Sequence, residues 1–373
     1  MLLWKWRRMP ANLLGERFAV MSFGESHGRC VGAVIDGCPA GLPIEVEEIQ
    51  REVDLRRPSS PLSTARAEAD RVDILSGLFN NRTTGAPICM VVWNRDVDST
   101  PYEEIKDTPR PGHADYPAHV KYLGFEDYRG GGRFSARVTV GFVMAGAVAK
   151  KLLSRCLGVR IIAYTKEIAG IKASDMSIDE IERRRYLNEV RCPDEEAAKL
   201  MREKILEAKE EGDSVGGIVE CIVDGLRPGI GEPIFSSLDS ELSKAIFSIP
   251  AVKGVEFGLG FQAARVKGSE DNDEYTIRDG KIVTLTNRSG GVLGGLSTGM
   301  PLVFRAAFKP PSSIAKKQKT VNLKTMSEVE IKVKGRHDPC VVPRAVPIVE
   351  AVTAIVLADL ALRGGYIPAV LEK

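Results

Sequence analysis

Glycine and proline interrupt this chain at short intervals, and three of its four histidines lie inside those interruptions. The blocks are 24–28 (Gly-Glu-Ser-His-Gly), 110–115 (Arg-Pro-Gly-His-Ala-Asp) and 335–339 (Gly-Arg-His-Asp-Pro); a fourth, 130–137, has the same character without a histidine. Glycine and proline mark turns and loops, and loops on a rigid scaffold often carry catalytic groups. Histidine changes its charge most readily near neutral pH. The scattered blocks therefore predict one composite site.

The segments between these blocks favour the α+β class, because helices and strands interleave without steady strand–helix alternation. Strands or extended segments are predicted at 17–23, 30–36, 88–93, 158–168, 216–225, 255–266, 301–308 and 328–333. Helices are predicted at 44–54, 139–154, 177–190, 194–211, 235–247 and 346–362. Residues 59–70 are predicted to be a loop, 94–136 a long irregular stretch, and the charged segment 170–212 a peripheral insertion. The chain shows no repeat and no clear linker.

The charge distribution points to a polyanionic ligand. With 52 basic and 50 acidic residues the net charge is only +2, which argues against a general nucleic-acid binder. Locally, however, arginines gather in or beside the glycine- and proline-rich segments, and their forks match carboxylates and phosphates. These arginines are Arg56, Arg57, Arg110, Arg129, Arg133, Arg137, Arg336 and Arg344.

Several other features narrow the class of protein. Seven widely spaced cysteines without a CxxC pair indicate free thiols in a reducing cytosol, hence a cytoplasmic protein. No apolar run reaches the roughly 18 residues of a membrane span, so no membrane partner is expected. Residues 1–9 lack the pattern of a signal peptide and are expected to be a disordered extension, with Met9 as an alternative start. No metal-ligand spacing is present, so no metal is predicted.

Three motifs leave alternatives open. Residues 24–28 fit the G-x-S-x-G nucleophile elbow, but the following residues suggest a second strand rather than the required helix, which disfavours a serine hydrolase built on Ser26. The run Gly130–Gly132 is either a flexible loop or an anion cradle formed with Ser135 and the next helix. Residues 309–313 form a turn, either an ordinary surface turn or one suited to a phosphate or a polar cofactor ring.

Taken in order along the chain, these blocks resemble the chorismate synthase family. The matching segments are 23–28, 56–58, 74–77, 110–116, 127–133, 135–137, 251–256, 290–295, 309–313, 336–340 and 344–347. The resemblance implies one catalytic domain over 10–373, with a helical layer between antiparallel β-sheets, usually assembled as a homotetramer. It also implies an anti-1,4 elimination of phosphate from 5-enolpyruvylshikimate 3-phosphate, giving chorismate for aromatic amino-acid biosynthesis. The reaction requires reduced FMN, with NAD(P)H only as a possible reductant.

The resemblance also implies roles for individual residues. Substrate contacts are expected from Arg56, Arg110, Arg137 and Arg344. Flavin contacts are expected from Arg133, Phe134, Ser135, Ala251, Gly294, Lys309, Pro310, Pro311, Ser312, Ser313 and Arg336. His27 would be the general acid for the departing phosphate, His113 would protonate or stabilise the reduced flavin, and Asp338 would relay a proton with Ser26 and Ser135. A rival interpretation is a non-catalytic protein that binds flavin or polyanions.

The chain departs from the family pattern at a few of these positions. The family usually has a second serine where Phe134 stands, and a glutamate where Val138 stands. It also commonly has Gly-Thr where this chain has Ser59-Ser60. Phe134 removes one hydroxyl from the flavin loop, so the departures concern cofactor affinity more than the reaction.

Overall fold

The computed structural model describes residues 11–57, 62, 69–335 and 337–372. The expectations for residues 1–9, for most of 59–70 and for Arg336 lie outside the described residues. The α-helices are α1 (Val46–Arg56), α2 (Thr100–Glu103), α3 (Asp115–Tyr122), α4 (Thr139–Leu157), α5 (Ile178–Arg184), α6 (Glu195–Glu210), α7 (Leu238–Ile246), α8 (Gly268–Asp271) and α9 (Val342–Arg363). Short 3-10 segments are η1 (Arg129–Phe134), η2 (Ala136–Val138) and η3 (Gly260–Arg265).

The longer strands belong to two antiparallel five-stranded sheets. One has the order β1-β2-β3-β7-β4, formed by Leu13–Leu14, Ala19–Gly24, Cys30–Asp36, Ile88–Trp93 and Val72–Ser76. The other has the order β11-β16-β10-β8-β9, formed by Val252–Phe257, Leu302–Phe308, Gly217–Asp224, Arg160–Ile168 and Ile171–Lys172. In the described part of the chain, two-stranded hairpins are β5–β6 (Leu78–Phe79, Arg82–Thr83), β12–β13 (Tyr275–Arg278, Lys281–Thr284), β14–β15 (Val292–Leu293, Leu296–Ser297) and β17–β18 (Gln318–Asn322, Ser327–Ile331).

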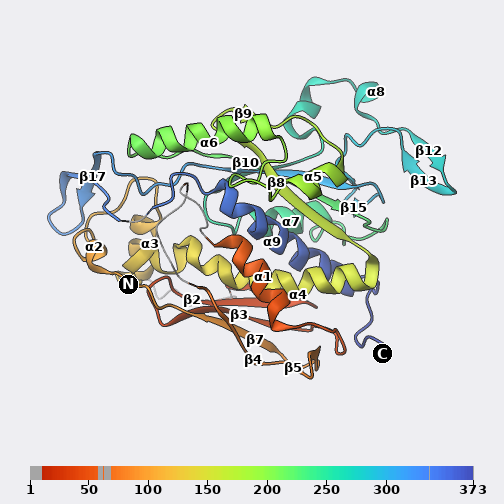
Figure 1. Cartoon of the computed structure of the whole chain (residues 1–373), viewed down its shortest axis with the longest axis horizontal. Coiled ribbons are helices and arrows are strands. Elements are labelled where there is room, and N and C mark those ends of the chain that lie inside the picture. Colours follow the sequence, from red (N-terminus) through yellow and green to blue (C-terminus); the bar gives the residue numbers. More distant parts are fainter. Residues whose placement is uncertain (1–10, 58–61, 63–68, 336, 373) are drawn as a thin grey trace, which may run out of the picture.

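A layer of helices lies between the two sheets (Figure 1). Helix α4 packs on β3 and α9 packs on β8 and β10, while α4 and α9 pack against each other. A Cβ added at Gly146 of α4 would lie 2.3 Å from the Cβ of Ala351, so only glycine permits this close helix crossing. The predicted α+β class, with helices between antiparallel sheets, is confirmed.

Burial along the elements explains this layering. Strand β16 alternates between buried and half-buried side chains, as expected for a strand with one face in the core. Helix α9 is buried along nearly its whole length, as a helix is when it is apolar all round and central in the fold. By length and composition α9 could cross a membrane, but 94% of its most apolar window is buried inside the protein.

The structure differs from the sequence predictions mainly in short elements. The stretch 94–136 contains α2, α3 and η1 instead of being irregular throughout. The extended segment predicted at 255–266 ends at Phe257, and η3 follows it. The hairpin β12–β13 was not predicted, and it projects from the body together with α8 (Figure 1). Helix α6, from the segment predicted as peripheral, lies along the outside of the molecule (Figure 1).

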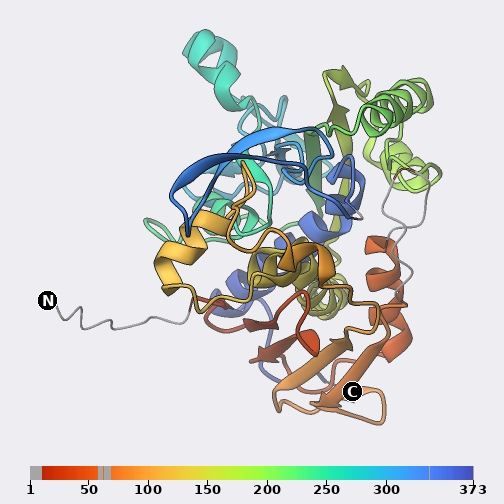
Figure 2. The ribbon, with the colours of Figure 1, turned by 90° about the vertical axis from the view of Figure 1, so that its left-hand side faces the viewer.

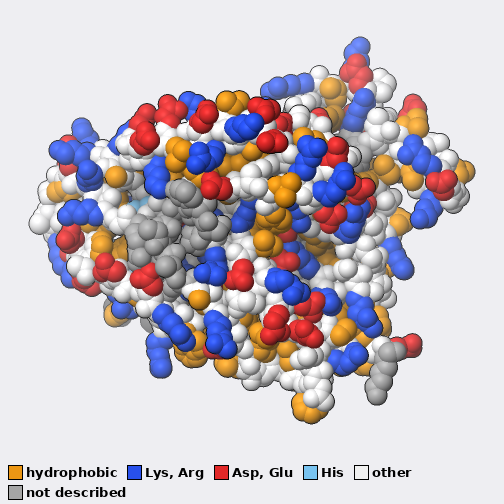
Figure 3. Space-filling model, in the orientation of Figure 1, with side chains coloured by type: hydrophobic (Ala, Val, Ile, Leu, Met, Phe, Trp, Pro, Cys, Tyr) orange, Lys and Arg blue, Asp and Glu red, His pale blue; other side chains and the backbone are white. Residues whose placement is uncertain are grey.

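Acidic and basic side chains are interspersed over the face shown in Figure 3, in keeping with the nearly balanced charge. On another side, Figure 2 shows the β17–β18 hairpin beside the segment that precedes α3. There Thr320 Oγ1 donates to Pro109 O at 2.6 Å, and Leu323 N donates to Asp107 O at 2.8 Å.

The seven cysteines are all free, as predicted, and most are shielded. Burial raises the pKa of Cys38, Cys221 and Cys340 to about 12. Because the thiolate is the reactive form, we expect these three thiols to escape iodoacetamide at pH 8 in the native protein and to react fully in urea. Mass spectrometry of the digested protein checks this. Equal labelling of the three in native and unfolded protein would contradict the burial described here.

Candidate active site

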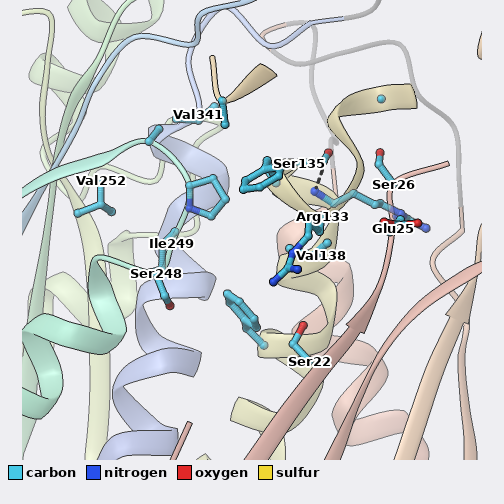
Figure 4. A pocket seen from close by; sticks show the side chains of 18 of the residues that line it. Ser22, Glu25, Ser26, Arg133, Ser135, Val138, Ser248, Ile249, Val252 and Val341 are labelled. Atoms are coloured by element: carbon cyan, nitrogen blue, oxygen red, sulfur yellow. Dashed lines mark hydrogen bonds between the residues drawn. The ribbon is translucent and has the colours of Figure 1, made fainter. Parts of the chain in front are cut away.

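One cavity of about 1170 Å³ collects residues from all four of the glycine-rich blocks. Figure 4 shows Arg133, Ser135 and Val138 on one side and Ser248, Ile249 and Val252 across from them. The first wall comes from the loops around β2, η1 and η2, and the second from the segment between α7 and β11. Ligand pockets commonly measure about 300–1,000 Å³, so this cavity has room for two small molecules together.

The glycine run brings two histidines together. Gly130 and Gly131 have φ angles of 60° and 81°, the left-handed region that favours glycine. A Cβ at Gly130 would lie 2.4 Å from His27 Nε2, and one at Gly131 would lie 3.3 Å from His113 Nε2. The missing side chains therefore let both imidazoles lie against the same short stretch of backbone. Two histidines from distant parts of the chain thus share one site.

His27 is nearly buried, and residues from the stretch 94–136 hold it. Its Nδ1 lies 2.9 Å from Ser99 Oγ, and its ring meets the edge of the Tyr102 ring with centroids 5.2 Å apart. The neighbouring Ser26 is buried, and its backbone N–H donates to Gly132 O at 3.2 Å. Sequence reasoning missed Ser99 and Tyr102. The sequence indicated these two residues only indirectly, because long loop regions are often functional.

Two buried arginines share one carboxylate. Asp70 forms ion pairs with Arg137 and, at 3.6 Å, with Arg56; all three side chains are at most 6% exposed. Burial and the nearby charge of Arg344 lower the pKa of Arg56 to about 9, so it stays protonated at neutral pH. Asp70 was not predicted, since it follows a polar stretch with no recognisable pattern. Its carboxylate offsets part of the cost of burying two cations.

Asn94 joins this pair to the His27 loop. Arg137 Nε donates to Asn94 Oδ1 at 3.1 Å, and Asn94 Nδ2 donates to Glu25 O at 3.0 Å and to Gly28 O at 2.9 Å. The amide therefore fixes the ends of the loop that carries Ser26 and His27. Sequence reasoning also missed this residue.

The other two arginines expected to bind substrate are also paired with carboxylates. Arg344 forms an ion pair with Asp338, whose side chain is 11% exposed. Arg110 pairs with Asp115 at 2.8 Å and donates from Nη1 to Ser313 Oγ at 3.1 Å. All four arginines and Asp338 line the cavity. Cations that are already held in place are well suited to receive an anionic ligand without a large loss of side-chain entropy.

Most of the residues expected to contact flavin line the same cavity. They are Arg133, Phe134, Ser135, Ala251, Lys309, Pro311, Ser312 and Ser313. Arg133 lies 5.6 Å from the Tyr122 ring and 6.0 Å from the Phe134 ring, while Ser135 Oγ accepts from Arg137 N at 3.2 Å. Pro310 and Gly294 are not among the lining residues; Gly294 lies at the tip of the β14–β15 hairpin.

The loop around Ser26 does not have the geometry of a nucleophile elbow. It connects β2 to β3, which pair antiparallel from Ala19 opposite Asp36 to Gly24 opposite Val31. An elbow needs a helix directly after the serine, and here a strand follows. The hydrolase alternative built on Ser26 therefore has no structural support.

A cavity lined by carboxylate-held arginines, with two histidines on one glycine run, is suited to an anionic ligand and to acid–base chemistry in a fold of the α+β class. A family model described as chorismate synthase matches residues 18–362. The chain belongs to the chorismate synthase family.

Its relatives and a solved structure agree with this assignment. Chorismate synthase from Dehalococcoides mccartyi (strain BAV1) is 55% identical over 364 residues, covering 97% of this chain and all of the relative. Chorismate synthase from Methanococcoides burtonii is 55% identical over 360 residues, covering 96% and 98%. A crystal structure of chorismate synthase superposes with a TM-score of 0.73 at 31% identity, covering 94% of this chain and 93% of the other.

Proposed function

We propose that this protein is a carbon–oxygen lyase that removes phosphate from 5-enolpyruvylshikimate 3-phosphate in an anti-1,4 elimination, giving chorismate for aromatic amino-acid biosynthesis. The observation that carries the proposal is the cavity itself, which four carboxylate-held arginines and two histidines line together. The proposed substrate has two carboxylates and a phosphate, which calls for several guanidinium groups. The active unit is a single catalytic domain over 10–373.

In the proposed reaction one group of residues binds the charged substrate and another transfers protons. Arg56, Arg110, Arg137 and Arg344 bind the anionic groups of the substrate. His27, held by Ser99 and Tyr102, acts as general acid and delivers a proton to the departing phosphate oxygen. Asp338, which forms an ion pair with Arg344, is the final proton acceptor, reached through the hydroxyls of Ser26 and Ser135.

Reduced FMN is proposed as the resident cofactor, and the cavity fits it in volume and in donors. Arg133, Lys309, Ser312 and Ser313 supply cationic and hydroxyl donors for its phosphate and polar ring edge, and Phe134 and Ala251 supply apolar surface. Ser135 and Pro311 also line the cavity, and Pro310, Gly294 and Arg336 are included in the proposed set on the family resemblance alone. When bound, the reduced flavin supplies transient electron density that eases departure of the phosphate. His113 would protonate or stabilise the reduced flavin.

The proposal also covers the cellular location and the oligomeric state of the protein. The protein is proposed to be a cytoplasmic homotetramer with no metal, no nucleic-acid partner and no membrane partner. NAD(P)H is proposed only as a possible reductant of the flavin. Light scattering after size exclusion tests the assembly, and a mass corresponding to one 40.6 kDa chain would contradict it.

An anaerobic assay with 5-enolpyruvylshikimate 3-phosphate tests the proposed reaction. Protein stripped of flavin is mixed with substrate and either chemically reduced FMN, oxidised FMN or no flavin. We expect chorismate only with reduced FMN. Binding of substrate without product under every condition would instead identify a non-catalytic polyanion-binding protein.

A further inference from the structure

Asp115, the first residue of α3, holds both a cavity arginine and a cavity histidine with one carboxylate. Oδ2 accepts from Arg110 Nε at 2.8 Å and from Arg110 N at 3.0 Å. Oδ1 accepts from Arg110 Nη2 at 2.8 Å and lies 2.5 Å from His113 Nδ1. Asp115 therefore connects two groups to which the proposed function gives different tasks.

The charge of Asp115 decides which nitrogen of His113 carries a proton. Burial alone would raise the pKa of Asp115, but hydrogen bonds from Arg110 and His113 outweigh it and hold this pKa well below the usual range. Asp115 is then a carboxylate, which only accepts hydrogen bonds. A contact of 2.5 Å between Oδ1 and Nδ1 consequently requires a proton on Nδ1. That leaves Nε2, the nitrogen beside Gly131, as the atom that gains or loses a proton.

We propose that Asp115 is a positioning residue that fixes His113 as the Nδ1–H tautomer, so that Nε2 alone exchanges protons with the ligands in the cavity. Arg110 also lies against the ring, with Nη2 3.0 Å from Nδ1 and 3.3 Å from Nε2, and His337 lines the same cavity. Asp115 supplies the carboxylate contact, 2.5 Å from Nδ1. The proposal rests on the proposed function only for the role of Nε2 in proton exchange with the flavin.

The same carboxylate limits what Arg110 can offer a ligand. Two of its three nitrogens, Nε and Nη2, donate to Asp115, and Nη1 points to Ser313 Oγ. Arg110 can therefore donate only individual N–H hydrogen bonds to an anion, because the paired N–H groups that would bind it in bidentate fashion are already partly engaged. Loss of Asp115 should weaken substrate binding through Arg110 and slow proton transfer through His113, and these two effects can be separated.

The chain provides a matched control in a second histidine–carboxylate pair. His119 of α3 lies 3.2 Å from Glu126 through Nδ1, its side chain is 45% exposed, and it does not line the cavity. His27, by contrast, contacts a hydroxyl, which both donates and accepts and so does not impose one tautomer. Glu126→Gln should therefore leave both turnover and the tautomer of His113 unchanged.

Nitrogen-15 NMR of the resting protein, labelled at histidine, tests the tautomer without substrate or flavin, with His113→Ala used to assign the signals. We expect His113 as Nδ1–H in the wild type and in Glu126→Gln, and a shift toward Nε2–H in Asp115→Ala. Should Asp115→Ala fail to fold, Asp115→Leu takes its place, because it also removes both acceptor oxygens while keeping a side chain of similar size. A wild-type His113 with its proton on Nε2, or an unchanged Nδ1–H tautomer in the Asp115 variant, would overturn the proposal.

Turnover then shows whether Asp115 acts through His113. We expect the Asp115 variant to lower kcat about 10²-fold, a usual contribution of one acid–base group, and to raise KM through Arg110. In a His113→Ala background the same substitution should still raise KM but lower kcat no further. An equal fall of kcat in both backgrounds would contradict the proposal. A wild-type protein without turnover would refute the proposed function instead, and the NMR result would still decide the role of Asp115.

Discussion

His27→Ala is expected to lower kcat by about 10²–10⁴, the range typical of one general acid–base group. The substitution removes the imidazole that packs against Gly130 and Tyr102, while the arginines that bind the substrate keep their carboxylate partners. KM should therefore change much less than kcat. Steady-state kinetics under anaerobic conditions with reduced FMN measures both.

His119→Ala is the control for this prediction. His119 is a half-exposed histidine of α3 that does not line the cavity, so turnover should stay near the wild-type value. If His27→Ala kept wild-type kcat, or if both variants lost activity equally, His27 would have no role as the general acid.

Asp70→Ala is expected to destabilise the fold by about 3–5 kcal/mol, as found when one partner of a buried ion pair is removed. The substitution takes away the carboxylate shared by Arg56 and Arg137, whose side chains are 2% and 6% exposed. Asp70 also has a φ of 46°, which adds strain for alanine. Equilibrium unfolding in urea measures the loss.

Asp73→Ala is a nearby comparison. Asp73 lies in β4 and accepts a hydrogen bond from Trp93 Nε1 at 2.8 Å at the surface, so its loss should cost only about 1 kcal/mol. Similar free energies of unfolding for the two variants would mean that the Asp70 cluster does not stabilise the protein. In that case other groups would have to offset the positive charges of Arg56 and Arg137.

The elements with strong apolar patterns were predictable from the sequence. Strands β3 and β7 and helices α4 and α9 appear where their apolar runs indicated, because burial of those runs drives their placement. The short helices α2 and α3 were not predicted, since polar residues and prolines dominate their sequences and tertiary contacts must support them. The layered arrangement came from the family resemblance rather than from periodicity.

The candidate site was predictable to a similar extent. The blocks around His27, His113 and Asp338 stand out by their glycine, proline and arginine content, and the structure brings them to one cavity. Asp70, Asn94, Ser99 and Tyr102 do not stand out, because each one matters only through a partner far away in the sequence. Asp115 was visible within its block, but its double contact with Arg110 and His113 could not be inferred from spacing.

The proposed reaction is tested most sharply by the number of chorismate molecules formed per flavin oxidised in a sealed anaerobic cuvette. A catalytic amount of reduced FMN and an excess of 5-enolpyruvylshikimate 3-phosphate are added to the stripped protein, and the absorbance of the flavin and of the product is followed together. We expect many turnovers per flavin, with the flavin still reduced at the end. One flavin oxidised for each product, or equal product formation when flavin is omitted, would contradict the proposed reaction.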